Sequence, residues 1–145
     1  MATVFATRES QYPLVAVFDI DMANAMKNTS GVLTNFKATA GVFDVILLPN
    51  NSIVIGGDIT VVEASNDSGT ATVKVGDATS DARYLAATTI KSTGRTALTL
   101  TGYENKSGEN LRITLANQNG DATLGKVRVT VQYVIRGRSN ELQTH

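Results

Sequence analysis

The sequence contains no cysteine, no tryptophan and a single histidine, and these absences remove whole classes of function. Without cysteine the chain can form neither a disulfide bond nor a thiolate metal site, so its stability must come from packing and association. The histidine, His145, is the last residue, and a chain end seldom holds a side chain in the fixed geometry of a base or metal ligand. The usual catalytic triads and zinc sites cannot be assembled from what remains. The composition therefore predicts no enzyme, no cofactor and no metal.

An excess of charge of one sign is also missing, because 13 basic residues balance 13 acidic ones. Nucleic-acid binding depends on excess lysine and arginine, so no nucleic acid is expected as a partner. No apolar run approaches the roughly 20 residues of a membrane-spanning helix, and the start of the chain lacks the apolar core of a signal peptide. The sequence predicts a protein made in a cytoplasm, without a membrane partner.

Short stretches in which apolar and polar residues alternate make up most of the chain. With 42% hydrophobic residues in 145, the chain can bury a real core as one domain. Turns rich in glycine, asparagine and serine separate the stretches, which is typical of a two-sheet sandwich. The predicted fold is all-β: a jelly-roll-like antiparallel β-sandwich of about eight strands, with at most one short helix. The predicted strands cover residues 12–20, 42–48, 52–63, 71–76, 88–92, 96–101, 110–116 and 126–136.

Local signals also predict how some neighbouring elements are arranged. Asp21 is the candidate cap of a short helix at residues 22–27. Strand 71–76 is expected to pair with strand 52–63, and the next two strands to flank a turn at 93–95. The expected organisation is a single domain over 1–145, made of an N-terminal arm at 1–11, a body at 12–136 and a C-terminal tail at 137–145.

Alternation indicates which faces of the strands are buried. In the last strand Val127, Val129 and Val131 share one face and polar residues share the other, as in a half-buried strand. Segments 14–18 and 45–48 are instead apolar on both faces and need cover on the second face. The short helix, residues 32–39 or a second subunit could supply this cover. A homodimer or homotrimer is predicted, because such a patch is uncommon on a monomer.

Three aspartates could in principle bind a cation. Asp19 and Asp21 lie two residues apart and share one face of a strand, and Asp44 could join them. The favoured interpretation is structural: Asp21 caps the helix and Asp19 is solvated. No metal site is therefore predicted.

A series of distinctive short stretches lies from residue 42 onward, at residues 48–49, 53–61, 73–77, 81–85, 93–98, 101–103 and 129–138. In these stretches the chain resembles small virion proteins encoded in the head gene clusters of tailed bacteriophages, and the resemblance covers about two-thirds of the chain. Some of these proteins are capsid decoration, or cement, proteins with a jelly-roll fold.

This resemblance implies a structural role on the outer capsid surface of a virion assembled in the host cytoplasm. Oligomers would bridge neighbouring major capsid proteins and resist the internal pressure of packaged DNA. The family's function lies in surfaces, so no family site residue can be transferred. The candidate capsid or subunit contacts come from the two ends of the chain. Val4 and Phe5 are apolar residues of the arm without a place in the strand pattern, and the charged residues Arg136, Arg138 and Glu141 lie where the last strand ends and in the tail.

Two other classes of function remain open. The first is a carbohydrate- or host-binding β-sandwich module of a phage head fibre or tail. Sugar sites usually stack the sugar on aromatic faces, and without tryptophan the best candidates are Tyr84 and Tyr103, which fit packing better. The second is a jelly-roll enzyme, but metal-dependent enzymes of this kind use histidine clusters, which the sequence lacks.

Overall fold

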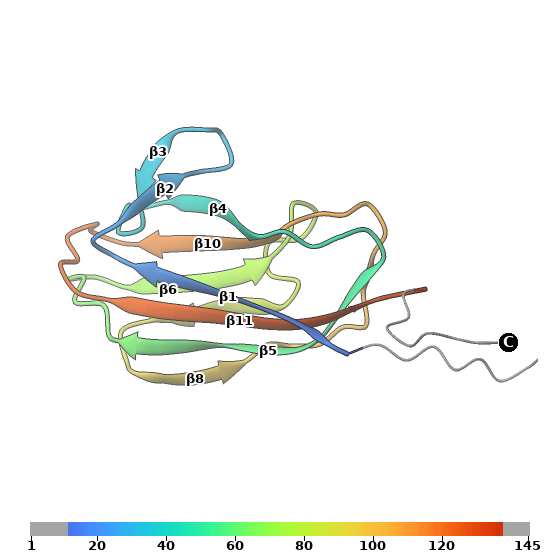
Figure 1. Ribbon diagram of the computed structural model, residues 1–145. Coiled ribbons are helices and arrows are strands. Elements are labelled where there is room, and N and C mark those ends of the chain that lie inside the picture. Colours follow the sequence, from blue (N-terminus) through green and yellow to red (C-terminus); the bar gives the residue numbers. More distant parts are fainter. Residues whose placement is uncertain (1–11, 138–145) are drawn as a thin grey trace, which may run out of the picture.

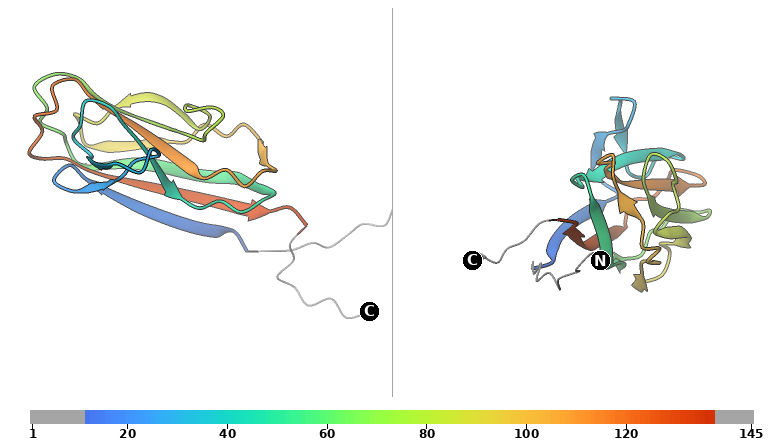
Figure 2. Two further views of the ribbon diagram at one scale, coloured as in Figure 1. Left: turned by 90° about the horizontal axis from the view of Figure 1, so that it is seen from above. Right: turned by 90° about the vertical axis from the view of Figure 1, so that its right-hand side faces the viewer.

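The alternating strands bury their apolar sides between two sheets that pack face to face (Figure 1). The computed structural model describes residues 12–137. The first sheet, called the β1 sheet, has the order β1 (Leu14–Asp21), β11 (Lys126–Ile135), β5 (Ser52–Glu63) and β8 (Gly94–Ala97), and the short β9 (Glu104–Asn105) also pairs with β5. The second, called the β4 sheet, has the order β4 (Gly41–Ile46), β10 (Leu111–Asn117), β6 (Ala71–Gly76) and β7 (Leu85–Thr89). Figure 2 shows both layers from two further sides.

The order of the strands is that of a double-sheet jelly roll. Along the eight sandwich strands the chain passes repeatedly from one sheet to the other, and only β6 and β7 are both consecutive and paired. All pairs are antiparallel. The predicted all-β sandwich with eight main strands is confirmed, and three short strands bring the total over residues 12–137 to eleven.

The predicted helix at residues 22–27 is wrong, because the described part of the chain contains no helix. Part of this segment is β2 (Ala25–Lys27), which pairs with β3 (Leu33–Asn35) in a hairpin that projects at the top of Figure 1. Asp21 ends β1 and accepts a hydrogen bond from the backbone N–H of Ala23 at 2.9 Å. An aspartate makes this same contact in a turn and at a helix start, so its presence could not separate the two.

Two expectations about pairing are also wrong. β5 and β6 lie in different sheets, although a turn joins them in the sequence. β7 and β8 likewise lie in different sheets, and the predicted turn at 93–95 lies partly inside β8. These two connections therefore cross between the sheets and do not close hairpins.

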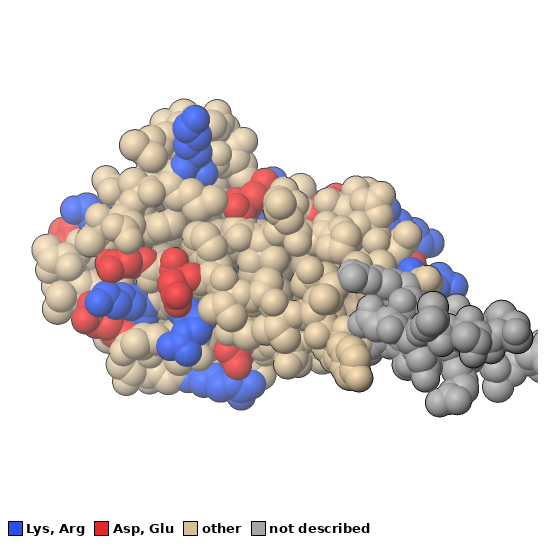
Figure 3. Space-filling view, viewed as in Figure 1, with Lys and Arg blue, Asp and Glu red and all other residues tan. Residues whose placement is uncertain are grey.

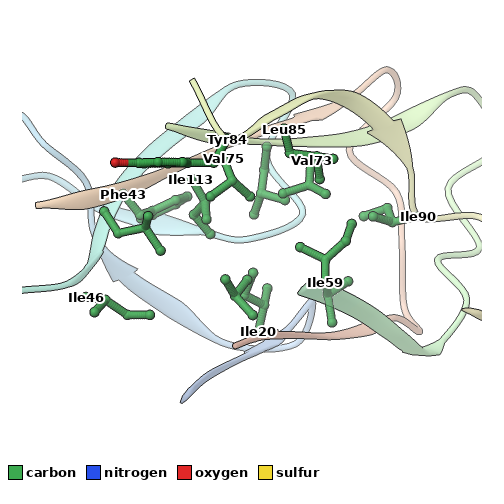
Figure 4. Close-up of a cluster of buried hydrophobic side chains, with 14 of the residues drawn as sticks. Ile20, Phe43, Ile46, Ile59, Val73, Val75, Tyr84, Leu85, Ile90 and Ile113 are labelled. Carbon is green, nitrogen blue, oxygen red and sulfur yellow. The ribbon is translucent and has the colours of Figure 1, made fainter. Parts of the chain in front are cut away.

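The core fills the space between the sheets. Figure 4 shows Ile20 and Ile59 of the β1 sheet facing Phe43, Val73 and Ile113 of the β4 sheet, and all five are essentially fully buried. The predicted inward valines of β11 are buried as well. The alternation in the sequence thus identified the inward faces correctly, because successive side chains of a strand point to opposite sides.

The two segments that are apolar on both faces have different surroundings. In segment 45–48, Ile46 and Leu48 are buried while Leu47 is 78% exposed. In β1, Val15 and Val17 remain 56% and 55% exposed on the outer face. No described residue of the chain provides the cover that the sequence predicts for this part of β1.

Candidate interaction surface

The outer side of β1 and β11 carries a regular set of exposed or half-buried residues. We call it the β1–β11 face. It consists of four residues of β1 and their four cross-strand neighbours on β11: Val15 opposite Gln132, Val17 opposite Thr130, Asp19 opposite Arg128 and Asp21 opposite Lys126. Because β1 is the edge strand of its sheet, the face is bounded on one side and continues over β11 towards β5.

The β1–β11 face has an uncharged half and a charged half. Figure 3 shows acidic and basic side chains together at the left of this side of the molecule, where β1 ends and β11 begins, and an uncharged area to their right. An open groove of about 310 Å³ runs over the charged half, and its lining includes Asp19, Asp21, Val62, Lys126 and Arg128. The surface therefore offers a partner both apolar area and charges of both signs.

The charges on this face are loosely held within one chain. Arg128 Nε lies 3.7 Å from Asp19 Oδ1, and their side chains are 47% and 81% exposed. Among the described residues Lys126 forms no ion pair. An exposed pair of this kind contributes only about 0–1 kcal/mol to stability. These side chains can therefore turn towards a partner at little cost to the fold.

Of the five predicted contact residues, only Arg136 lies in the described part of the chain. Its side chain is 70% exposed, and Arg136 Nη1 donates to Glu104 Oε2 at 3.1 Å. Its backbone N–H donates to the carbonyl of Asn51 at 2.8 Å. These contacts join the end of β11 to β9 and to the start of β5. Val4, Phe5, Arg138 and Glu141 lie outside the described residues, so their role stays a prediction.

The three aspartates considered for a cation are not brought together. Asp44 belongs to the β4 sheet and accepts from Arg112 Nε at 2.8 Å, whereas Asp19 and Asp21 lie on β1. Within residues 12–137 no three His, Cys, Asp or Glu side chains form a group that could hold a metal ion.

A buried ion pair that the sequence did not reveal orders the loop after β6. Asp77 is only 4% exposed and accepts from Arg83 Nε, and the Arg83 guanidinium lies 3.5 Å from the centre of the Tyr103 ring. Tyr84 is buried beside them, and burial together with the nearby Asp77 carboxylate raises the pKa of Tyr84 to about 12. Tyr84 is inaccessible and offers no ring for a sugar, and Arg83 occupies one of the two faces of the Tyr103 ring.

We expect Asp77→Asn to change how stability depends on pH. Burial by itself raises the pKa of Asp77, but hydrogen bonds from Arg83 and from the backbone of Ser80 and Thr79 outweigh it and hold this pKa below the ordinary value of an aspartate. A carboxylate with a lowered folded-state pKa stabilises the fold above its unfolded-state pKa, and this contribution is lost as the pH falls through the folded-state value.

Urea unfolding of both proteins at pH 7 and pH 3 measures this effect. At pH 7 the variant should have a lower free energy of unfolding than the parent. At pH 3 the difference between the two free energies should be smaller. Asp81→Asn is the control, because Asp81 forms a more exposed ion pair with Lys74 and should change stability little at either pH. An equal loss for Asp77→Asn at both pH values would contradict the assigned role.

Comparison with known proteins finds similarity among solved capsid structures. No protein-family model matches the chain, and no curated relative matches it. A chain in the structure of the cyanophage Pam1 capsid asymmetric unit is 26% identical, with a TM-score of 0.64 over 92% of this chain and 94% of that one. A chain in the acid-stable capsid structure of Helicobacter pylori bacteriophage KHP30 is 17% identical, with a TM-score of 0.59 over 85% and 87% of the two chains. The fold is shared with both, and the likeness supports a phage capsid-related protein.

Proposed function

We propose that this chain is a structural, non-enzymatic protein that binds the outside of a tailed-phage capsid and bridges neighbouring major capsid proteins. One observation carries the proposal: the jelly roll matches a chain of the Pam1 capsid structure over 92% of its own length and 94% of that chain. The match therefore covers nearly all of both chains.

The surface chemistry supports a role in binding proteins. A decoration protein acts through contact area, with its own copies as well as with the capsid, and the β1–β11 face presents two exposed valines and four loosely held charges. An arm that becomes ordered on binding can extend such contacts across a seam between capsid subunits. Val4 and Phe5 are the proposed apolar contacts of the N-terminal arm, and Arg136, Arg138 and Glu141 the proposed polar contacts near the C-terminus.

Undecorated capsids of the phage that encodes the chain provide the test. The purified protein should co-sediment with these capsids in saturable amounts, and decorated capsids should resist a higher temperature than bare ones. Sedimentation and a light-scattering melt measure the two effects. Failure to bind, or binding without a gain in heat resistance, would reject bridging and would favour the host-binding alternative, in which the protein binds host cells or glycans.

Removal of residues 2–10 should separate capsid binding from folding. The deletion touches none of the strands described within residues 12–137, so the thermal unfolding temperature should stay within a few degrees of that of the full chain. Capsid affinity should fall, because Val4 and Phe5 are removed. Val4→Ser with Phe5→Ser keeps the length of the arm and serves as the matched variant. If the deletion weakens binding but the double substitution does not, the two side chains are not the contacts.

A further inference from the structure

The charges of the β1–β11 face are arranged in two rows of opposite sign. The acidic row, Asp19 and Asp21, lies on β1, and the basic row, Arg128 and Lys126, lies directly beside it on β11. A partner surface of a single charge sign would attract one row and repel the other. A surface with the two rows in the opposite order would place a basic row over the acidic row and an acidic row over the basic row. A second copy of the same face, turned to face the first, is such a surface.

The position of the symmetry axis follows from these rows. Consider a two-fold axis that runs parallel to the strands, midway between β1 and β11. It stacks β1 of one copy over β11 of the other, with no shift along the strand direction. Asp19 of each copy then faces Arg128 of the other, and Asp21 faces Lys126. Placed over β1 itself, the same axis would set Asp19 against Asp19. Among the two-fold axes parallel to the strands, the two charge rows therefore favour the one midway between β1 and β11.

The uncharged half of the face agrees with the same axis. Val15 and Val17 of one copy would be covered by the Gln132 and Thr130 side chains of the other, since these are their cross-strand neighbours. This contact removes from water the two valines for which the described chain provides no cover. Contacts of this isologous kind, in which the same patch is used twice, are the commonest form of protein dimer.

We propose that two copies of this chain associate through their β1–β11 faces about this axis, and that Asp19–Arg128 contacts between the copies determine the alignment. The inference refines the homodimer or homotrimer that the sequence predicts, and it goes beyond the proposed function. It leaves the outer side of the β4 sheet available to a capsid. Its test uses the purified full chain alone, so its failure is distinct from a failure to bind capsids.

Charge reversal with complementation tests this arrangement. In the proposed dimer, Asp19→Arg places an arginine against Arg128 of the other copy at two equivalent contacts. Arg128→Asp places an aspartate against Asp19 of the other copy at the same two contacts. Each variant alone should dimerise roughly 10- to 100-fold more weakly than the parent, because like charges across an interface repel. An equimolar mixture should form a heterodimer of near-parental affinity, since the arginine introduced in one chain then meets the aspartate introduced in the other. Sedimentation velocity and native mass spectrometry measure the species.

Three further proteins keep the test decisive. The double variant Asp19→Arg with Arg128→Asp restores the charge pair within each chain and between chains, so it should fold and dimerise like the parent. Asp44→Arg and Arg112→Asp alter a similar cross-strand pair on the β4 sheet and should leave association unchanged. A monomeric or trimeric parent, single variants that dimerise normally, or a mixture that stays monomeric would each overturn the proposal.

Discussion

Gly57→Ala should destabilise the protein by roughly 3 kcal/mol or more, as the sum of backbone strain and overpacking. Gly57 lies in β5 beside Gly56, where the pairing with β11 shifts register at a bulge. Its φ of 141° is a conformation that residues with a Cβ rarely adopt. A Cβ at this position would also collide with the carbonyl oxygen of Thr130 on the neighbouring strand. Backbone atoms in a sheet cannot move aside as a flexible side chain can, so the collision adds to the strain.

Gly94→Ala is the matched control for this prediction. Gly94 has nearly the same φ, 146°, but an added Cβ would meet nothing within 4 Å. Its substitution should therefore cost only the backbone strain of about 1–3 kcal/mol. Chemical unfolding of the three proteins gives the two differences in unfolding free energy. Equal losses for both glycines would show that the close approach of β5 and β11 contributes nothing.

Phe43→Ala should lower the free energy of unfolding by about 3–5 kcal/mol, the range for removing a buried aromatic ring. Phe43 is fully buried on β4, and its ring centre lies 4.8 Å from that of Phe36 in an edge-on arrangement. Phe36 directly follows β3, so this contact also holds the β2–β3 hairpin against the sandwich. The loss of unfolding free energy should therefore exceed the cost of transferring one ring to water, because the substitution leaves a cavity between the hairpin and the sandwich.

Leu47→Ala is the control for the second prediction. Leu47 lies four positions further along the chain and is largely exposed, so its truncation should change stability by no more than about 0.5 kcal/mol. Urea titration followed by far-UV circular dichroism measures both variants. A loss for Phe43→Ala as small as that for Leu47→Ala would mean that the two sheets repack around the gap.

Most strand positions could be predicted from the sequence. The strands at 52–63 and 71–76 agree with β5 and β6 at both ends, because their apolar residues alternate and turn residues bound them. The buried side of β11 was equally clear, since the period of two follows from the backbone of any extended strand. The exposed valines of β1 could also be anticipated as a surface in need of a partner.

Only the tertiary structure decided which sheet each strand joins. The connection after β5 has the composition of a hairpin turn, yet β6 lies in the opposite sheet, because pairing depends on which distant strand best completes the core. The structure also placed Asp77 in a buried ion pair and put Asp19 beside Arg128, residues far apart in the sequence. Local periodicity determined which side chains share a face, since it is a property of a single strand. The partners of each face were decided by contacts between distant segments, which no local pattern contains.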